Sequence, residues 1–109
     1  MIINIKRRGK IKVSARRLSN FGKFTGLMFK SRNSDNLLFE FPRDTMMFIH
    51  SYFVFFSFLA VWLDAENKVI EEKIVKPFSP SVAPKIKFRK LIEIPINKKN
   101  RELINNLLK

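Results

Sequence analysis

MMFIHSYFVFFSFLAVWLD, residues 46–64, is the stretch that decides the fold, because it carries no charged side chain before Asp64 and is crowded with phenylalanine. A helix of about 20 such residues could cross a bilayer. However, the stretch is rich in Phe, Tyr, Trp and Val, which favour strands, and His50, Ser51 and Ser57 are poorly suited to bilayer depth. The composition therefore favours two buried β-strands over a membrane span.

The whole chain has 109 residues, a length typical of one domain covering residues 1–109. It contains no cysteine, which excludes disulfides, thiol catalysis and cysteine zinc sites. The formal net charge of +13 favours association with polyanions or an anionic membrane surface. The amino terminus is apolar before it turns basic at Lys6, the reverse of a secretory signal, so we expect a soluble cytoplasmic protein.

Short strands separated by turn residues are predicted elsewhere. Residues 2–5 and 11–13 are predicted to pair around a basic turn at Gly9, and residues 37–41 form a strand before Pro42. Residues 69–75 form a strand after a turn at 65–68. Residues 86–94 form a strand pair or one bent strand that ends before Pro95. Residues 18–29 predict irregular structure with a helical turn or two. Asn97 is a suitable N-cap for a C-terminal helix through Leu108, whose apolar stripe includes Ile104 and Leu107.

Ordered blocks span nearly the whole chain: GLMFK at residues 26–30, LLFEFP at 37–42, IHSYFVFFSFLAVWLD at 49–64, KPF at 76–78 and LIEIP at 91–95. These blocks resemble the uncharacterised protein family 0127, also called domain of unknown function 192. The resemblance implies a single compact β-sandwich or barrel of jelly-roll type, in which residues 49–64 form two adjoining strands. It implies no established activity.

Two charged positions of that family pattern are apolar in this chain. Where the family has an arginine and an aspartate four positions apart, this sequence has Phe55 and Leu59. Losing both together avoids leaving one charge buried and unpaired, so we interpret the exchange as packing in place of a polar pair. The large side chains of the segment are accordingly expected to be buried: Phe53, Phe56, Phe58 and Trp62.

His50 occupies a family-motif position of unknown role and is the only histidine. No carboxylate has metal-ligand spacing to it, so we predict neither a metal nor a cofactor. Ser51 adjoins it, but neighbouring side chains on a strand point to opposite faces, which argues against a Ser–His nucleophile. We therefore expect a hydrogen-bonded structural histidine and no catalytic residue. Glu71, Glu72 and Glu93 are interpreted as solvated surface.

Two groups of basic residues are the remaining functional signal. The candidates for polyanion contacts are Lys6, Arg7, Arg8 and Lys10 in one group, and Lys85, Lys87 and Arg89 in the other. On a strand the second group would lie along one face, a spacing suited to following phosphates. Exposed aromatic platforms for single-strand binding are not predicted, because most phenylalanines lie in the expected core segments.

The leading hypothesis is a small noncatalytic β-sandwich binding module, with the ligand left open. A basic nucleic-acid-binding protein is the first alternative. A hydrolase or sugar-active enzyme is the second, and it would require a pocket with converging carboxylates. No transmembrane segment is predicted.

Overall fold

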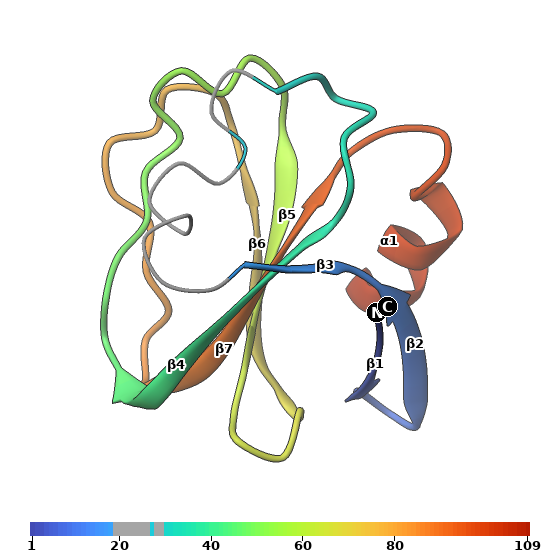
Figure 1. Ribbon diagram of the computed structural model, residues 1–109, viewed down its shortest axis with the longest axis vertical. Helices are drawn as coiled ribbons and strands as arrows, with labels where there is room; N and C mark the ends of the chain where they lie inside the picture. The colour runs from blue at the N-terminus through green and yellow to red at the C-terminus, as the bar shows by residue number, and fades with distance from the viewer. Residues whose placement is uncertain (19–26, 28–29) are drawn as a thin grey trace.

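The structure is a computed structural model that describes residues 1–18, 27 and 30–109. Along these residues the elements follow the order β1 (Ile2–Lys6), β2 (Lys10–Ser14), β3 (Arg16–Leu18), β4 (Leu37–Thr45), β5 (Phe58–Leu63), β6 (Val69–Val75), β7 (Phe88–Pro95) and α1 (Arg101–Leu108) (Figure 1). The prediction of a mainly β protein with a short C-terminal helix is confirmed. The prediction of irregular structure at residues 19–26, 28 and 29 lies outside the described residues.

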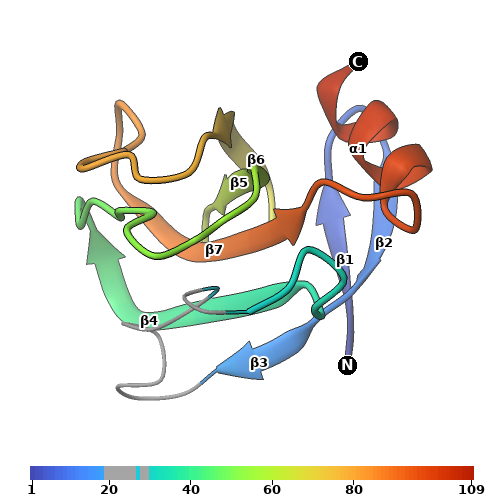
Figure 2. The same cartoon turned by 90° about the horizontal axis from the view of Figure 1, so that it is seen from above.

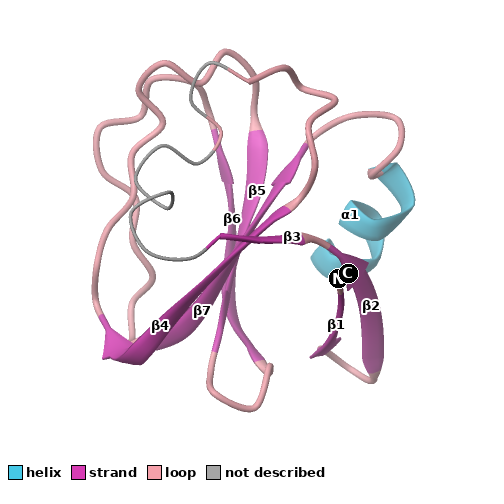
Figure 3. Ribbon diagram, viewed as in Figure 1, coloured by secondary structure: helices cyan, strands magenta, loops and turns pink. Residues whose placement is uncertain are grey.

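The strands form two separate sheets. β1 and β2 make an antiparallel hairpin, and the larger sheet has the order β3-β4-β7-β5-β6. β3, which the sequence did not predict, runs parallel to β4, whereas the other pairs in this sheet are antiparallel. The hairpin and α1 lie together on one side of the molecule, and the long loops that precede β5 and β7 lie on the other (Figure 2; Figure 3).

β5 sits between two cores, which explains its unbroken run of apolar residues. Leu59, Val61 and Leu63 face an aliphatic core shared with β4, β7, the hairpin and α1. Phe58, Ala60 and Trp62 face an aromatic core on the opposite side of the sheet. The alternation of a strand thus buries both faces of the same six residues.

The prediction of two strands within residues 46–64 is wrong, because only Phe58–Leu63 is a strand. The preceding residues form a loop, in which Ile49 pairs with Val82 as an isolated bridge. Phe53 has φ 61°, a left-handed conformation that interrupts an extended chain. Among the described residues, no helix has the length and apolar character needed to cross a bilayer.

Of the two prolines predicted to end strands, only Pro95 does so. Pro42 lies inside β4, at the irregular pairing between Glu40 and Thr45, where the ladder to β7 is interrupted and a missing N–H is tolerated. Pro95 is the last residue of β7 and ends it as predicted. β7 begins at Phe88, so Ile86 lies before the strand.

The helix begins at Arg101 with Asn100 as its N-cap residue, three positions after the predicted Asn97. Asn97 instead accepts a hydrogen bond from the Asn100 backbone N at 2.8 Å. The buried Asn100 amide donates to Pro95 O at 2.8 Å and to Asn36 Oδ1 at 3.0 Å, so its side chain is drawn toward the sheet rather than onto the helix end. This amide pair fixes α1, with its buried Ile104, against the aliphatic core.

Candidate functional site

The outward side of the β1–β2 hairpin is basic because of its antiparallel register. Lys6 lies directly opposite Lys10, and Lys12 lies opposite Asn4. The three lysines are exposed and form no ion pair with any described residue. Like charges that face each other across a strand pair are destabilising, so the hairpin carries this charge at a cost to stability. We call Lys6, Lys10 and Lys12 the basic face.

The turn of the hairpin extends the positive charge. Gly9 has φ 121°, which only glycine adopts readily, and this conformation closes the turn beside Arg8. Lys6 N donates to Asn67 O at 2.8 Å, which brings Lys68 of the β5–β6 turn next to the end of β1. A shallow hollow between the two turns is lined by Lys6, Arg7, Arg8, Gly9, Lys68 and Val69.

Arg7 differs from its basic neighbours because it is committed to the fold. Its Nη1 donates to Glu72 Oε2 at 2.9 Å and its Nη2 lies 2.8 Å from Glu72 Oε1, a two-pronged pair with β6. Nη2 also donates to Lys109 O at 3.2 Å. The sequence placed Arg7 among the polyanion contacts, whereas the structure shows it tying the hairpin to β6 and to the end of α1.

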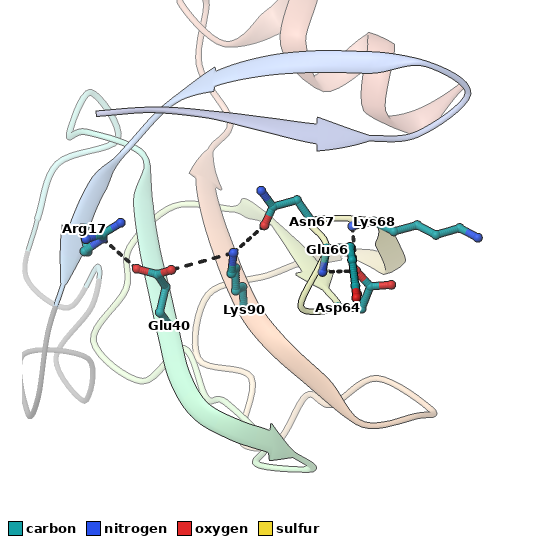
Figure 4. Close-up of polar contacts among 7 residues, drawn as sticks. All are labelled: Arg17, Glu40, Asp64, Glu66, Asn67, Lys68 and Lys90. Carbon is teal, nitrogen blue, oxygen red and sulfur yellow. Dashed lines mark hydrogen bonds and ion pairs between the residues drawn. The ribbon is translucent and has the colours of Figure 1, made fainter.

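A row of polar contacts crosses the sheet beside the hairpin (Figure 4). Arg17 Nε lies 2.7 Å from Glu40 Oε1, and Glu40 Oε2 lies 3.8 Å from Lys90 Nζ, which donates to Asn67 Oδ1 at 2.6 Å. Asp64 Oδ1 accepts from the backbone N of Glu66 and of Lys68, both at 2.9 Å, and shapes the turn that carries Asn67. Arg17 and Lys90 thus share the single negative charge of Glu40, and the row positions the turn on which the hairpin end rests.

The second predicted basic group does not lie along one strand face. Lys85 and Lys87 precede β7, and only Arg89 belongs to it. Arg89 Nε donates to Asp44 Oδ1 at 3.0 Å, whereas Lys85 and Lys87 are exposed. The start of β7 and the hairpin lie on opposite sides of the molecule, so the structure does not join the two groups into one surface (Figure 1).

Glu93, interpreted from the sequence as solvated, is buried with 6 % of its surface exposed. Its strand neighbours Leu37 and Ala60 belong to the aromatic core, and Glu93 shares their face of the sheet. Among the described residues it has no ion pair or hydrogen bond, and burial raises the pKa of its carboxyl to about 8. The indole Nε1 of Trp62, in the same core, also lacks a described partner.

His50 and Ser51 have separate roles. His50 is exposed, and its Nδ1 accepts a hydrogen bond from Tyr52 N at 3.3 Å. Ser51 is fully buried, donates from Oγ to Lys76 O at 2.6 Å and accepts from Ser79 N at 2.6 Å. Ser51 therefore joins the loop before β5 to the loop after β6.

These joined loops expose aromatic side chains within segments that we expected to form the core. Phe53 is 47 % exposed, so its predicted burial is wrong, and Phe55 is 58 % exposed, so its interpretation as packing is wrong as well. Both rings lie edge-on to the exposed Phe78, at centroid distances of 6.3 and 5.4 Å. We call Phe53, Phe55 and Phe78 the ring cluster. Its only sequence signal is the proline-rich segment around Phe78, which is typical of a loop.

Two of the large side chains next to the ring cluster behave as predicted. Phe56 and Phe58 are buried in the aromatic core, as is Trp62. Leu59, by contrast, is buried in the aliphatic core on the other face of the sheet, so it does not pack with Phe55. The two positions of the missing polar pair therefore have unrelated environments in this chain.

The hollows beside β3 and α1 provide no pair of converging carboxylates among the described residues. The first is lined by Met1, Ser14, Ala15, Arg16, Arg17, Asp35, Asn36 and Lys99. The second, at the helix surface, is lined by Lys98, Lys99, Arg101, Glu102, Asn105, Asn106 and Lys109. Each contains one acidic residue among several cations, an arrangement suited to binding anions rather than to paired general acid and base catalysis.

No family model and no curated protein matches this sequence. Two solved structures share its fold at 12 % sequence identity, and each covers 94 % of this chain. One is a protein of unknown function from Novosphingobium aromaticivorans, with a TM-score of 0.75 over 78 % of that chain. The other is a proposed transcription regulator from Sinorhizobium meliloti, with a TM-score of 0.77 over 83 % of that chain.

Proposed function

We propose that this protein is a noncatalytic binding module that binds nucleic acid through the basic face of its hairpin. The observation that carries the proposal is the Lys6–Lys10 pair. These lysines face each other across two strands, with Lys12 on the same side, and no described acid offsets them. A fold that keeps like charges in register despite their repulsion is suited to a ligand that brings the opposite charge.

The spacing of the basic face supports an extended polyanion. Alternate residues on a strand lie about 6.8 Å apart, so Lys10 and Lys12 can contact successive negative groups. Arg8 and Lys68 extend the same positive surface around the turn. The structural neighbour described as a proposed transcription regulator supports nucleic acid as the polyanion class.

We further infer that the chain belongs to the uncharacterised protein family 0127 and has that family's jelly-roll architecture. Support comes from the ordered sequence blocks, three of which lie on strands of the large sheet. LLFEFP begins β4, FLAVWL forms β5 and LIEIP ends β7. Superposition on an experimentally solved family member tests the inference: His50, Asp64 and Pro95 should coincide with the family's equivalent blocks.

The functional proposal is tested by titrating the protein with single- and double-stranded DNA and with RNA at several salt concentrations. We expect a log–log slope of about −3 to −5, as for roughly four to six neutralised phosphates. The triple variant Lys6→Gln, Lys10→Gln and Lys12→Gln should flatten this slope by about two to three, because each phosphate contact contributes nearly one.

The matched control is Lys76→Gln, Lys85→Gln and Lys87→Gln, which removes the same charge from the opposite side of the molecule. This control should weaken binding only through the loss of net charge and should keep a steeper slope than the hairpin variant. Equal slopes for the two variants would show that the hairpin has no special part in binding and would contradict the proposal.

A further inference from the structure

The loops on the side opposite the hairpin expose large apolar side chains on two segments that lie together. Ile49 and Val82 exchange two backbone hydrogen bonds of 2.8 Å, and Phe78 N donates to Ser51 O at 2.9 Å. The exposed members, all 41–60 % accessible, are Met46, Met47, Phe48, Tyr52, Phe53, Phe55, Phe78 and Ile86. A patch of this kind on a small protein marks a contact with another surface.

The ring cluster is held outward by the backbone. Phe53 and Phe78 have φ 61° and 60°, a left-handed conformation that is unfavourable for a large side chain. Ser51, fully buried, fastens both segments through its side chain, its backbone N and its backbone O. The fold thus maintains two strained residues in order to expose their rings, as sites of contact with a ligand commonly do.

The charge around the cluster identifies the kind of surface that fits. No acidic residue occurs between Asp44 and Asp64 or between Glu72 and Glu93. The second interval supplies the exposed Lys76, Lys85 and Lys87, which have no ion pair among the described residues. Two carboxylates lie at its border: Glu71 accepts from Lys85 N at 2.9 Å, and Asp44 pairs with Arg89. The exposed side chains of Lys76, Lys85 and Lys87 leave the border positive overall, and an apolar surface with a positive border complements a partner that is apolar inside and anionic outside.

We propose that the loop-covered side of the molecule, which carries the ring cluster and the exposed Lys76, Lys85 and Lys87, docks on the surface of an anionic phospholipid bilayer (Figure 1). The rings and the exposed Met46, Met47 and Ile86 enter the boundary between head groups and acyl chains, and the lysines contact the anionic head groups. This surface lies opposite the basic face and is independent of the proposed nucleic-acid function.

A bilayer fits the patch better than a single-stranded nucleic acid does. Bases stack on open ring faces, whereas Phe53 and Phe55 each pack edge-on against Phe78, at interplanar angles of 72° and 73°. Methionine and isoleucine side chains offer no stacking surface, but they partition readily into the acyl boundary. The mixed aromatic and aliphatic composition therefore favours lipid.

The test is co-sedimentation of the full chain with vesicles of phosphatidylcholine alone and with vesicles containing 30 % phosphatidylglycerol. We expect binding to the anionic vesicles only. Lys76→Gln, Lys85→Gln and Lys87→Gln should together lower the partition coefficient about 100-fold, at about fivefold per charge, and Lys6→Gln, Lys10→Gln and Lys12→Gln should lower it much less. Both triple variants are measured with DNA and with vesicles. The proposed function fails if DNA binding does not depend on the hairpin lysines, whereas the membrane proposal fails if vesicle binding does not depend on Lys76, Lys85 and Lys87.

Glycine variants separate docking from folding. Phe53→Gly and Phe78→Gly remove a ring and also relieve the left-handed strain, so each should keep a melting temperature close to or above that of the original chain. Each should lower vesicle binding about tenfold. Ile2→Gly, which removes an exposed side chain from the hairpin side, is the control and should leave vesicle binding unchanged.

Three results would overturn the proposal. The first is the absence of binding to anionic vesicles. The second is equal loss of vesicle binding in the two lysine variants, which would reduce the effect to net charge. The third is loss of single-stranded DNA binding, with vesicle binding retained, in the Phe53→Gly and Phe78→Gly variants, which would identify the patch as a base-stacking surface.

Discussion

The two faces of the large sheet are covered in different ways, and the difference determines what each side exposes. The hairpin and α1 cover one face with regular elements whose inward positions are aliphatic and whose outward positions, apart from Ile2 and Leu108, are polar or charged. Loops cover the other face, over an aromatic core that includes Glu93. A strand or helix separates its two sides by periodicity, whereas a loop has no repeating pattern and can expose rings beside buried ones.

The comparison is sharpest for phenylalanines that are three positions apart. Phe58 is 1 % exposed in β5, while Phe55 is 58 % exposed in the preceding loop. Phe58→Ala should lower the free energy of unfolding by about 3 to 5 kcal/mol, because it leaves a cavity in the aromatic core. Phe55→Ala should change it by less than about 0.5 kcal/mol. Urea denaturation of both variants measures the difference, and similar losses would place Phe55 in the core after all.

The buried carboxyl of Glu93 predicts a pH dependence specific to the loop-covered face. Its folded pKa of about 8 lies above the usual 4.5, so the native state keeps a proton that the unfolded chain releases. Stability should therefore fall as the pH rises from about 4.5 to about 8, by about 2 to 3 kcal/mol between pH 5 and pH 7.

Urea denaturation across this pH range tests the assignment with two variants. Glu93→Gln should abolish the decline, whereas Glu40→Gln, on the hairpin side of the sheet, should leave it in place. A decline of the same size in Glu93→Gln would show that another group is responsible.

On the hairpin side, changing one charge should alter the free energy of unfolding only slightly. Lys10→Glu places an acid opposite Lys6 and converts a repulsive cross-strand pair into an attractive one. Thermal unfolding should show a gain of about 0.5 kcal/mol, while binding to DNA should weaken. A loss of stability would mean that Lys10 already has a favourable contact in the native protein.

Sequence patterns predicted the regular elements well and the loops poorly. The hairpin around Gly9 and the strand at residues 69–75 are found where alternation and turn residues indicated them. The apolar stripe indicated the helix, although its N-cap is Asn100 and not Asn97. The first part of the apolar run was assigned to a strand because composition alone does not distinguish a buried strand from an apolar loop. The short β3 was missed because three residues are too few to show a period.

The candidate surfaces were predicted only in part, because contacts between residues distant in the sequence leave no local pattern. Two lysines of the basic face, Lys6 and Lys10, were among the contacts predicted from the sequence, whereas Lys12 was not. The commitment of Arg7 to Glu72 joins residues 65 positions apart, and no local pattern indicates such a pair. The burial of Glu93 likewise depends on Leu37 and Ala60, which belong to the two strands that flank β7.

The sequence by itself determined the mainly β character, the positive charge and the alternation that sends lysines outward on the hairpin. These properties depend on composition and on the two-residue period of a strand, which are local. Only the tertiary structure decided which apolar side chains are buried and that the carboxyl of Glu93 is buried with them. Burial depends on segments brought together from distant parts of the chain, so Phe58 and Phe55 can share one apolar run and still face different surroundings.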